Sequence, residues 1–455
     1  MAAIEKGLPG RLAVACHGIA AVMMPLWRLM PSHVRAEATA LHLAVRDCPA
    51  SRATTEQAAR GLLRRRAPIP PPPGRRTVLM LTPSLAAGGA ERQLVLTARG
   101  LATRGWTVEV AAKHLEIPAG CDALRGDLGA IPVFAVAAKD TAPAGRALAD
   151  GGLQALPPDF FALLADLHAL ILDRRPTVVH AWMDEMAAAG GLAAAMAGVP
   201  RIVLAGRNLA PHHFGVPQLG AIAGVMRALA DDPRVVLVNN SRAGAADYAR
   251  WLDVQEHRIG VVRNGFVPIA DGDRSAWRRR LGIPAEAPVI GGLFRLAPEK
   301  RPLLWMEVAA RVLDRISDAH FVIFGDGPLR PTMEQRAERL RLRGRIHLPG
   351  VTSEREDAFA AFDLFLLTSV HEGTPNVVLE CQWLGLPMVV TGAGGVVEAV
   401  AEPELIDDHP DTLAEAVVAR LGRASVRRHD WIERRFGLAR MIDETETLFG
   451  GSVAS

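Results

Sequence analysis

The stretch LFLLTSVHEGTPNVVLECQWLGLPMVVTGA, residues 364–393, contains an apolar strand, a loop with Gly and Pro, an apolar helix and a second apolar strand. Thr374 suits the N-cap of this helix and Pro375 its first position, so the helix should run to about Leu384. Glu380 stands among apolar residues there, where a charge is costly unless something pairs with it. Either Glu380 points at solvent or it points at a ligand.

The same alternation of apolar strands and amphipathic helices continues along the chain, in two series. The predicted strands are 77–84, 107–113, 176–182, 201–207 and 234–241, followed by 289–296, 320–327, 345–350, 364–369 and 387–393. This pattern favours two α/β domains, each with a doubly wound parallel sheet, joined near 266–288. Since ligands of such sheets bind at the carboxyl ends of strands, two facing sheets should form a cleft.

Length and composition agree with two globular domains. The chain has 455 residues, of which 49% are hydrophobic and 22% charged. Its four cysteines lie far apart without CxxC spacing, so neither a disulfide framework nor a zinc site is indicated, and a reducing cytosol fits best.

The first 76 residues are basic, with twelve Lys or Arg against four acids, a net of +8. RRRAPIPPPPGRR at 64–76 favours an extended linker, which makes 1–74 a separate helical extension. Residues 12–27 form either an interfacial helix on anionic lipid or a helix packed on the main body. No stretch is apolar enough for a spanning helix, no secretory signal is indicated, and no nucleic-acid-binding module is present.

The loop between the strand at 364–369 and the following helix predicts a nucleotide site. The N–H groups and dipole at Gly373–Val377 suit a phosphate. Glu380, nearly two turns into the helix, can accept hydrogen bonds from a vicinal diol such as ribose, and Glu372 can reach a sugar beyond the phosphates. The alternative is a surface glutamate plus a solvated loop glutamate.

Two further loops of the second half lie at strand ends. GLFRLAPEKRP at 292–302 places Arg295 and Lys300 where two cations can clamp a diphosphate, although simple solvation is the commoner role of basic loop residues. FGDGPLR at 324–330 is a glycine turn containing Gly327, which is weak evidence alone.

In the first half, Gly88 and Gly89 open a helix after the first strand, where glycine allows close backbone approach to a ligand. His180 ends a predicted strand and should face the cleft, or else it is a satisfied histidine at a strand end. Other polar residues near neighbouring strand ends are expected to shape an acceptor pocket. They are Asp184, Arg207, Asn208, His212 and His213.

Taken together, these blocks resemble the family 4 retaining glycosyltransferases, which have the GT-B fold of two Rossmann-like domains. The matching blocks are GGAERQ at 88–93, VNNSRAG at 238–244, VVRNG at 261–265, GLFRLAPEKRP at 292–302, FVIFGDGPLR at 321–330, IHLPGV at 346–351 and HEGTPNVVLECQWLGLPMVVTGAGGVVE at 371–398. By that resemblance the domains are 75–268 on the acceptor side and 269–455 for the donor, with the last helix packing back on the N-terminal domain.

The resemblance also implies roles. Glu380 would hold the donor ribose, Glu372 would contact the transferred sugar, Arg295 and Lys300 would bind the diphosphate, and His180 would lie near the donor sugar. Trp182 replaces the second histidine of a frequent His-x-His pair, which puts that last role in doubt. The implied catalytic residues are Glu372, Arg295, Lys300 and His180. The implied donor-binding residues are Gly88, Gly89, Arg295, Lys300, Gly327, Gly350, Val351, Glu372, Gly373, Thr374, Pro375, Asn376, Val377 and Glu380.

Such enzymes need no metal or other cofactor, and the DGD sequence at 271–273 is interpreted as a turn. The implied function is transfer of a sugar from a UDP- or GDP-sugar to a glycan or lipid-linked acceptor in surface-polysaccharide synthesis. The implied location is cytoplasmic and peripheral on the inner membrane face, with no nucleic-acid partner. Two alternatives stay open: a sugar-nucleotide 2-epimerase, and a non-catalytic partner subunit of a polysaccharide-assembly complex.

Overall fold

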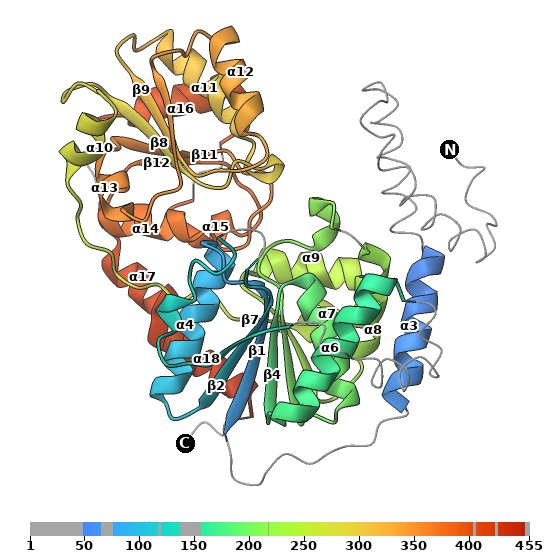
Figure 1. Ribbon diagram of the computed structural model, residues 1–455. Coiled ribbons are helices and arrows are strands. Elements are labelled where there is room, and N and C mark those ends of the chain that lie inside the picture. Colours follow the sequence, from blue (N-terminus) through green and yellow to red (C-terminus); the bar gives the residue numbers. More distant parts are fainter. Residues whose placement is uncertain are drawn as a thin grey trace, which may run out of the picture.

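The computed structural model describes residues 49–64, 76–116, 120–136, 156–216, 218–403, 406–423 and 426–450. Within them the chain forms two parallel sheets, one in each half, each covered by helices (Figure 1). The predicted two-domain α/β architecture is therefore confirmed.

The N-terminal domain is built on a seven-stranded sheet in the order β3-β2-β1-β4-β5-β6-β7, with every pair parallel. Its strands are β1 (Thr77–Ser84), β2 (Thr107–His114), β3 (Val133–Ala135), β4 (Val178–Trp182), β5 (Arg201–Ala205), β6 (Val235–Asn239) and β7 (Ile259–Val261). Central strands such as β1 are apolar on both faces because helices cover both sides of the sheet.

The two faces of this sheet carry different helices. One core includes residues of α3 (Pro49–Arg64), α6 (Pro158–Arg174), α7 (Asp184–Met196), α8 (Leu219–Leu229) and α9 (Arg242–Leu252). The opposite core is closed by α4 (Gly89–Thr103) and by the last helix, α18 (Leu438–Leu448).

The C-terminal domain is built on a five-stranded parallel sheet in the order β10-β9-β8-β11-β12. Its strands are β8 (Val289–Leu293), β9 (His320–Phe324), β10 (Ile346–Gly350), β11 (Leu364–Leu367) and β12 (Met388–Val390). Its helices are α10 (Arg274–Arg280), α11 (Pro302–Leu313), α12 (Arg330–Arg339), α13 (Arg355–Ala360), α14 (Asn376–Leu384), α15 (Val396–Ala399), α16 (Pro410–Arg420) and α17 (His429–Phe436).

The chain crosses between the domains twice, and the two crossings lie side by side. The Phe266 N–H donates to the Phe436 carbonyl at 2.6 Å, and Phe266 forms a parallel bridge with Gly437. After this point α18 packs along α4 of the N-terminal domain (Figure 1). The helices approach closely because Gly100 of α4 has no side chain to collide with Ile442.

Part of the basic extension is helical and packs on the N-terminal domain. Helix α3 lies along α8, where a Cβ at Gly224 would come within 2.5 Å of the Arg52 carbonyl oxygen. Residues 12–27, which were predicted as an interfacial or packed helix, lie outside the described residues, as does most of the proline-rich linker. Among the helices of the described ranges, none combines the length and apolar character needed to cross a bilayer.

The observed strands differ from the expected ones in two ways. The short edge strands β3 and β7 were not anticipated, and several predicted strands end two or three residues early. The strand predicted at 320–327, for example, stops at Phe324 because Gly325 has φ 133°, which breaks the extended backbone.

Candidate functional site

The loop after β11 and the start of α14 form the centre of the candidate site. Pro375 is the N-cap residue of α14, and no side chain of the described residues caps its first N–H groups. The Thr374 hydroxyl donates to the Asn240 carbonyl of the N-terminal domain at 2.7 Å. Thr374 as N-cap was therefore a wrong prediction, because this hydroxyl serves the contact between the domains. The uncapped N–H groups leave the positive end of the helix available to an anion.

Glu372 is held in this loop by two donors. The side chain is 5% exposed, and its Oε1 accepts hydrogen bonds from Lys300 Nζ at 2.5 Å and Ser369 Oγ at 2.7 Å. The Val370 N–H donates to the Glu299 carbonyl at 2.8 Å, which ties the loop after β8 to the loop after β11. The structure thus brings two of the predicted site residues, Glu372 and Lys300, into direct contact.

Glu380 is 4% exposed on α14 and is paired with two arginines. Arg355, at the start of α13, donates to Oε2, and Arg92 of α4 lies 3.5 Å from Oε1. These partners explain how an apolar helix tolerates a buried carboxylate. Because Arg92 belongs to the other domain, Glu380 also lies at the contact between the two domains. The interpretation of Glu380 as a solvent-facing residue is wrong.

Arg295 is exposed beyond the end of β8, and its charge acts on Glu91 near the start of α4. Burial raises the pKa of Glu91 in α4, and the positive charge of Arg295 opposes that rise. Arg295 therefore lies at the same domain boundary as Glu380, although the two residues come from different loops.

Glycines let the ends of β8, β9 and β10 approach one another. A Cβ at Gly327 would come within 2.5 Å of the Leu296 carbonyl oxygen, so this turn requires glycine. The Gly325 N–H donates to the carbonyl of Gly350, which has φ 92°. Val351 follows directly and is 68% exposed, an unusual exposure for a large apolar side chain.

Gly88 and Gly89 start α4 opposite the C-terminal domain. A Cβ at Gly88 would meet the Glu91 carboxylate, and one at Gly89 would lie 3.4 Å from Asn376 Nδ2. The two predicted glycines therefore accommodate neighbouring protein groups, and Gly89 marks where the N-termini of α4 and α14 meet.

A polar network joins the two domains at this place. Asn264 Nδ2 donates to the Thr374 carbonyl at 2.9 Å and to Asn376 Oδ1 at 2.8 Å. Gln93 of α4 exchanges two hydrogen bonds with the backbone of Gly265 and donates to Asn376 Oδ1 at 3.3 Å. A Cβ at Gly373 would collide with Asn240. The carboxyl-end loops of the two sheets thus touch directly at the start of α14.

His180 does not face the C-terminal domain, contrary to the prediction. It lies in the middle of β4, is 3% exposed and packs against Trp182 and Phe449, with ring centroids 5.1 and 5.6 Å apart. Burial, with a smaller contribution from Arg207, lowers its pKa to about 3. The residue points to the face of the sheet that α18 covers, so the structure gives it a place in the core.

Trp182, which stands where a second histidine is frequent, packs against Arg207. The Arg207 guanidinium stacks 4.2 Å above the Trp182 ring and donates to Asn264 Oδ1 at 2.6 Å. Burial lowers the pKa of Arg207 to about 9. This strand end therefore contributes an aromatic support to the network between the domains.

The other residues expected around an acceptor pocket fall into two places. Asp184 is half-buried at the start of α7 and accepts a hydrogen bond from the Tyr248 hydroxyl. His212 and His213 lie in the 3-10 helix Pro211–Phe214, beside Asp247 of α9, and the three together offer ligand atoms for a metal ion. His371, the residue before Glu372, stacks on His213 with ring centroids 4.4 Å apart.

A surface hollow of about 490 Å³ lies elsewhere, between α10, α13 and the C-terminal end of α14. Its lining includes Asp271 and Gly272 of the 271–273 turn and none of the predicted site residues. Within that turn Asp273 caps α10 by accepting the Ser275 N–H, which gives the DGD sequence a role in local structure.

The arginines that contact Glu380 were not predicted from the sequence. Arg92 lies inside the GGAERQ block, so its place in a quoted motif was an available signal. Arg355 lies in a charged stretch of the kind that is usually exposed to solvent, and nothing in the local sequence distinguishes it from its neighbours. Asn264 was likewise quoted within VVRNG without a role.

Comparison with known proteins gives two family matches, one in each domain. Residues 287–422 match the family described as glycosyl transferases group 1, and residues 87–268 match the one described as glycosyltransferase family 4. The first range contains Arg295, Lys300, Glu372 and Glu380.

Two curated relatives are similar over about half of this chain. The Vi polysaccharide biosynthesis protein VipC/TviE of Salmonella typhi is 31% identical over 256 residues, covering 55% of this chain and 44% of that protein. The UDP-Gal:alpha-D-GlcNAc-diphosphoundecaprenol alpha-1,3-galactosyltransferase of Escherichia coli is 28% identical over 241 residues, covering 51% of this chain and 62% of that enzyme. The chain thus spans about half the length of the curated relatives it matches.

Among solved structures, the Anabaena protein HepE in complex with UDP and glucose is similar with a TM-score of 0.66 at 21% identity. The similarity covers 83% of this chain and 100% of that one. At this identity the likeness shows a shared fold.

Proposed function

The chain belongs to the family 4, group 1 glycosyltransferases, and from that premise we propose that it transfers a sugar from a nucleoside-diphosphate sugar to a glycan or lipid-linked saccharide. We further propose that the reaction retains the anomeric configuration and uses no metal ion at the diphosphate.

The observation that carries this proposal is the arrangement around α14. Two buried carboxylates, Glu372 and Glu380, flank an uncapped helix N-terminus, and each is already in contact with a cation. A nucleoside diphosphate has the complementary chemistry: a diol that donates hydrogen bonds to a carboxylate, and phosphates that accept them from N–H groups.

The proposed positions follow from this complementarity. The ribose hydroxyls would bind Glu380, the diphosphate would lie at the N–H groups from Gly373 to Val377, and Arg295 and Lys300 would neutralise its charge. Glu372 would then contact the transferred sugar. The turns at Gly327 and Gly350, with exposed Val351, would lie beside the nucleobase.

The Glu380 arginines bear on how the donor binds. Arg355 donates a hydrogen bond to the Glu380 carboxylate and Arg92 forms an ion pair with it at 3.5 Å, at the oxygens to which the ribose hydroxyls would donate. Binding would therefore exchange one set of donors for another at the same carboxylate.

Retention requires the acceptor to arrive on the face that the leaving group vacates. The bond between the anomeric carbon and the diphosphate oxygen breaks, and a bond from that carbon to the acceptor oxygen forms on the same face. The acceptor hydroxyl proton passes to a phosphate oxygen of the leaving diphosphate. Arg295 and Lys300 stabilise the charge on that diphosphate as it departs.

The names of the curated relatives support an acceptor in surface-polysaccharide synthesis. One is named for Vi polysaccharide biosynthesis, and the other for transfer to a diphosphoundecaprenol-linked sugar. A lipid-linked acceptor would place the chain at a membrane surface, and the basic first 76 residues would favour anionic lipid there.

The first test is thermal stabilisation of the purified chain by UDP, GDP and ADP. One nucleotide should raise the melting temperature of the wild type, because binding to the native state stabilises it, and Glu380→Ala should lose the effect. Glu415→Ala, which removes an exposed partner of Arg315, serves as the control and should respond like the wild type.

The outcomes separate the alternatives. If no nucleotide binds, the non-catalytic partner subunit becomes the better account of the fold. If a nucleotide binds, NMR of the glycosylated product gives its anomeric configuration, and an inverted product contradicts the retaining mechanism.

A further inference from the structure

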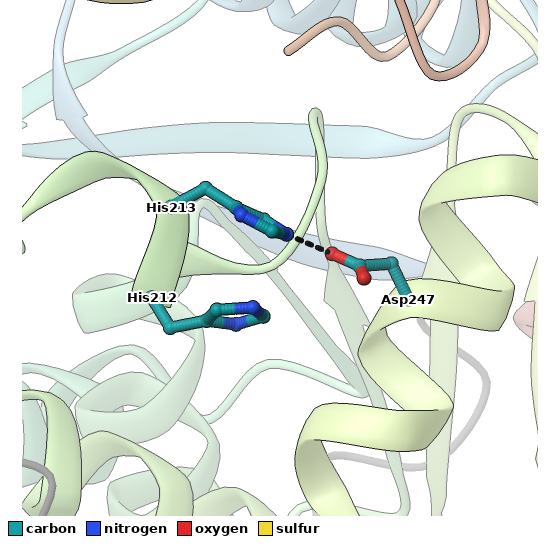
Figure 2. A group of neighbouring side chains, drawn as sticks. All are labelled: His212, His213 and Asp247. Atoms are coloured by element: carbon teal, nitrogen blue, oxygen red, sulfur yellow. Dashed lines mark hydrogen bonds and ion pairs between the residues drawn. The ribbon is translucent and has the colours of Figure 1, made fainter. Parts of the chain in front are cut away.

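Two histidines and a buried aspartate meet beside the candidate site, on the N-terminal domain. His212 and His213 come from the 3-10 helix Pro211–Phe214, and Asp247 comes from the middle of α9 (Figure 2). The two imidazoles lie one above the other, with centroids 3.9 Å apart, and both rings extend toward the carboxylate. His213 Nε2 lies 3.0 Å from Asp247 Oδ2.

The spacing of the ligand atoms suits a metal ion. One nitrogen of each histidine and one carboxylate oxygen all lie within 4.8 Å of one another. Two ligands of a tetrahedral zinc ion, each about 2.0–2.1 Å from the metal, are separated by roughly 3.4 Å. Small side-chain movements would therefore bring all three atoms to ligating distance.

The carboxylate is held in place by the protein. Asp247 is 7% exposed, and its Oδ2 also accepts the Ala210 N–H at 2.9 Å. Arg250 donates to the other oxygen, Oδ1, at 2.9 Å. Such outer contacts orient a ligating carboxylate and tie it to the backbone that carries both histidines.

We propose that His212, His213 and Asp247 form a binding site for one divalent transition-metal ion of the zinc class. Two imidazoles and one carboxylate favour Zn²⁺ and similar ions over Mg²⁺ or Ca²⁺, which prefer oxygen ligands. Three protein ligands leave a position for water or for a substrate group.

The site differs from the proposed diphosphate site. The cations expected there, Arg295 and Lys300, belong to the C-terminal domain, whereas all three metal ligands belong to the N-terminal domain. His371 contacts both places, because it stacks on His213 and directly precedes Glu372. An ion that fixes the His213 ring would therefore also restrict His371 and, through it, the loop that carries Glu372.

The test measures metal binding by the full chain, so it does not depend on the proposed transferase activity. After removal of metals with EDTA and dialysis, Zn²⁺ is titrated by calorimetry in the presence of a competing chelator. Co²⁺ is titrated in parallel, and its visible absorption reports the ligand set. We expect one ion per chain, with binding weakened roughly tenfold or more in His212→Ala and His213→Ala.

A second pair of histidines provides a matched control. His320 Nδ1 and His347 Nε2 lie 3.1 Å apart in the C-terminal domain, and their additional neighbour is Arg345 rather than a carboxylate. His347→Ala should bind Zn²⁺ as the wild type does. Asp247→Asn keeps an oxygen for the Ala210 N–H while removing the charge, and it should also weaken binding.

Three results would overturn the proposal. They are no stoichiometric Zn²⁺ binding by the wild type, equal binding by His212→Ala and the wild type, and loss of binding in His347→Ala. Because His212 is exposed, His212→Ala should fold normally, and its circular dichroism spectrum and melting temperature check this.

Discussion

Arg355 donates a hydrogen bond to Glu380 from the neighbouring helix α13, and it does so at the carboxylate expected to receive the donor ribose. Arg92 approaches the other oxygen of the same carboxylate from the N-terminal domain. The residue that the sequence marks as a ligand contact is therefore already satisfied by the protein, so donor binding must compete with these arginines.

Arg355→Ala tests this competition. Removing Arg355 leaves Glu380 buried with the more distant Arg92, so the variant should lose about 1–3 kcal/mol of stability without nucleotide. Bound nucleotide should then raise its melting temperature more than it raises that of the wild type, because the ribose hydroxyls replace the missing donor. The measurement is the shift in melting temperature at matched nucleotide concentrations. A smaller shift than in the wild type would show that Arg355 itself contacts the nucleotide.

The contact between Lys300 and Glu372 predicts two separable effects. Lys300→Met should weaken nucleotide binding and lower kcat/KM by roughly 10²–10³, because a charge that stabilises the leaving diphosphate is lost. Glu372→Gln should leave binding of the free nucleoside diphosphate nearly unchanged and lower kcat, since this side chain is expected to contact the sugar. Calorimetry with the nucleotide and initial rates with the nucleotide-sugar separate the two. Equal loss of nucleotide affinity in both variants would contradict these roles.

The positions of the main strands along the chain could be predicted from sequence because each is a run of apolar residues between glycine or polar turns. VLMLT in β1 and FVIF in β9 carry that signal, whereas VFA in β3 and IGV in β7 are three-residue edge strands without it. Their pairing depends on a neighbouring strand, which a local pattern does not contain.

The side-chain partners in the site could be predicted less well, because they come from distant parts of the chain. His180 was correctly placed on a strand, but the face it occupies is closed by Phe449, which lies about 270 residues later. Glu380 was identified as a charge in an apolar helix that faces either solvent or a ligand, but its neighbours Arg92 and Arg355 come from another domain and another helix. The contact of Thr374 with Asn240 likewise arises only when the two domains meet.

Burial of His180 predicts a loss of stability in acid. Its pKa is about 3 in the folded protein against 6.5 ordinarily, so between these values the unfolded chain binds the additional proton. Stability should therefore fall by about 2 kcal/mol from this group between pH 7 and pH 5. Asp184 acts in the opposite direction, because burial raises its pKa to about 6 and the folded form gains a proton first as pH falls.

Comparison of variants separates the contribution of His180 to the pH dependence of stability from that of Asp184. His180→Leu should lose about 2 kcal/mol less than the wild type over the same pH interval, whatever its absolute stability, because only the titrating group has been removed. Chemical unfolding at pH 7 and pH 5 gives both differences. His257→Leu, which changes an exposed histidine, should keep the wild-type dependence. Equal losses in His180→Leu and the wild type would mean that His180 titrates normally.

The network at Asn264 predicts a variant that separates donor binding from turnover. Asn264 is buried and joins Arg207 and Asn240 of one domain to Thr374 and Asn376 of the other. Asn264→Ala removes all four contacts and leaves buried polar groups unpaired, which should destabilise the chain by about 1–3 kcal/mol.

Its catalytic effect should be specific. The groups proposed to bind UDP or another nucleotide belong mainly to the C-terminal domain, so Asn264→Ala should bind nucleotide within about threefold of the wild type. Turnover should fall roughly tenfold or more, because the acceptor side is no longer fixed against the donor side. Asn264→Asp keeps the acceptor oxygen for Arg207 but loses both donor N–H groups. Its turnover should therefore lie between that of the wild type and that of Asn264→Ala. Nucleotide affinity that declines as steeply as kcat would show instead that the network shapes the donor site itself.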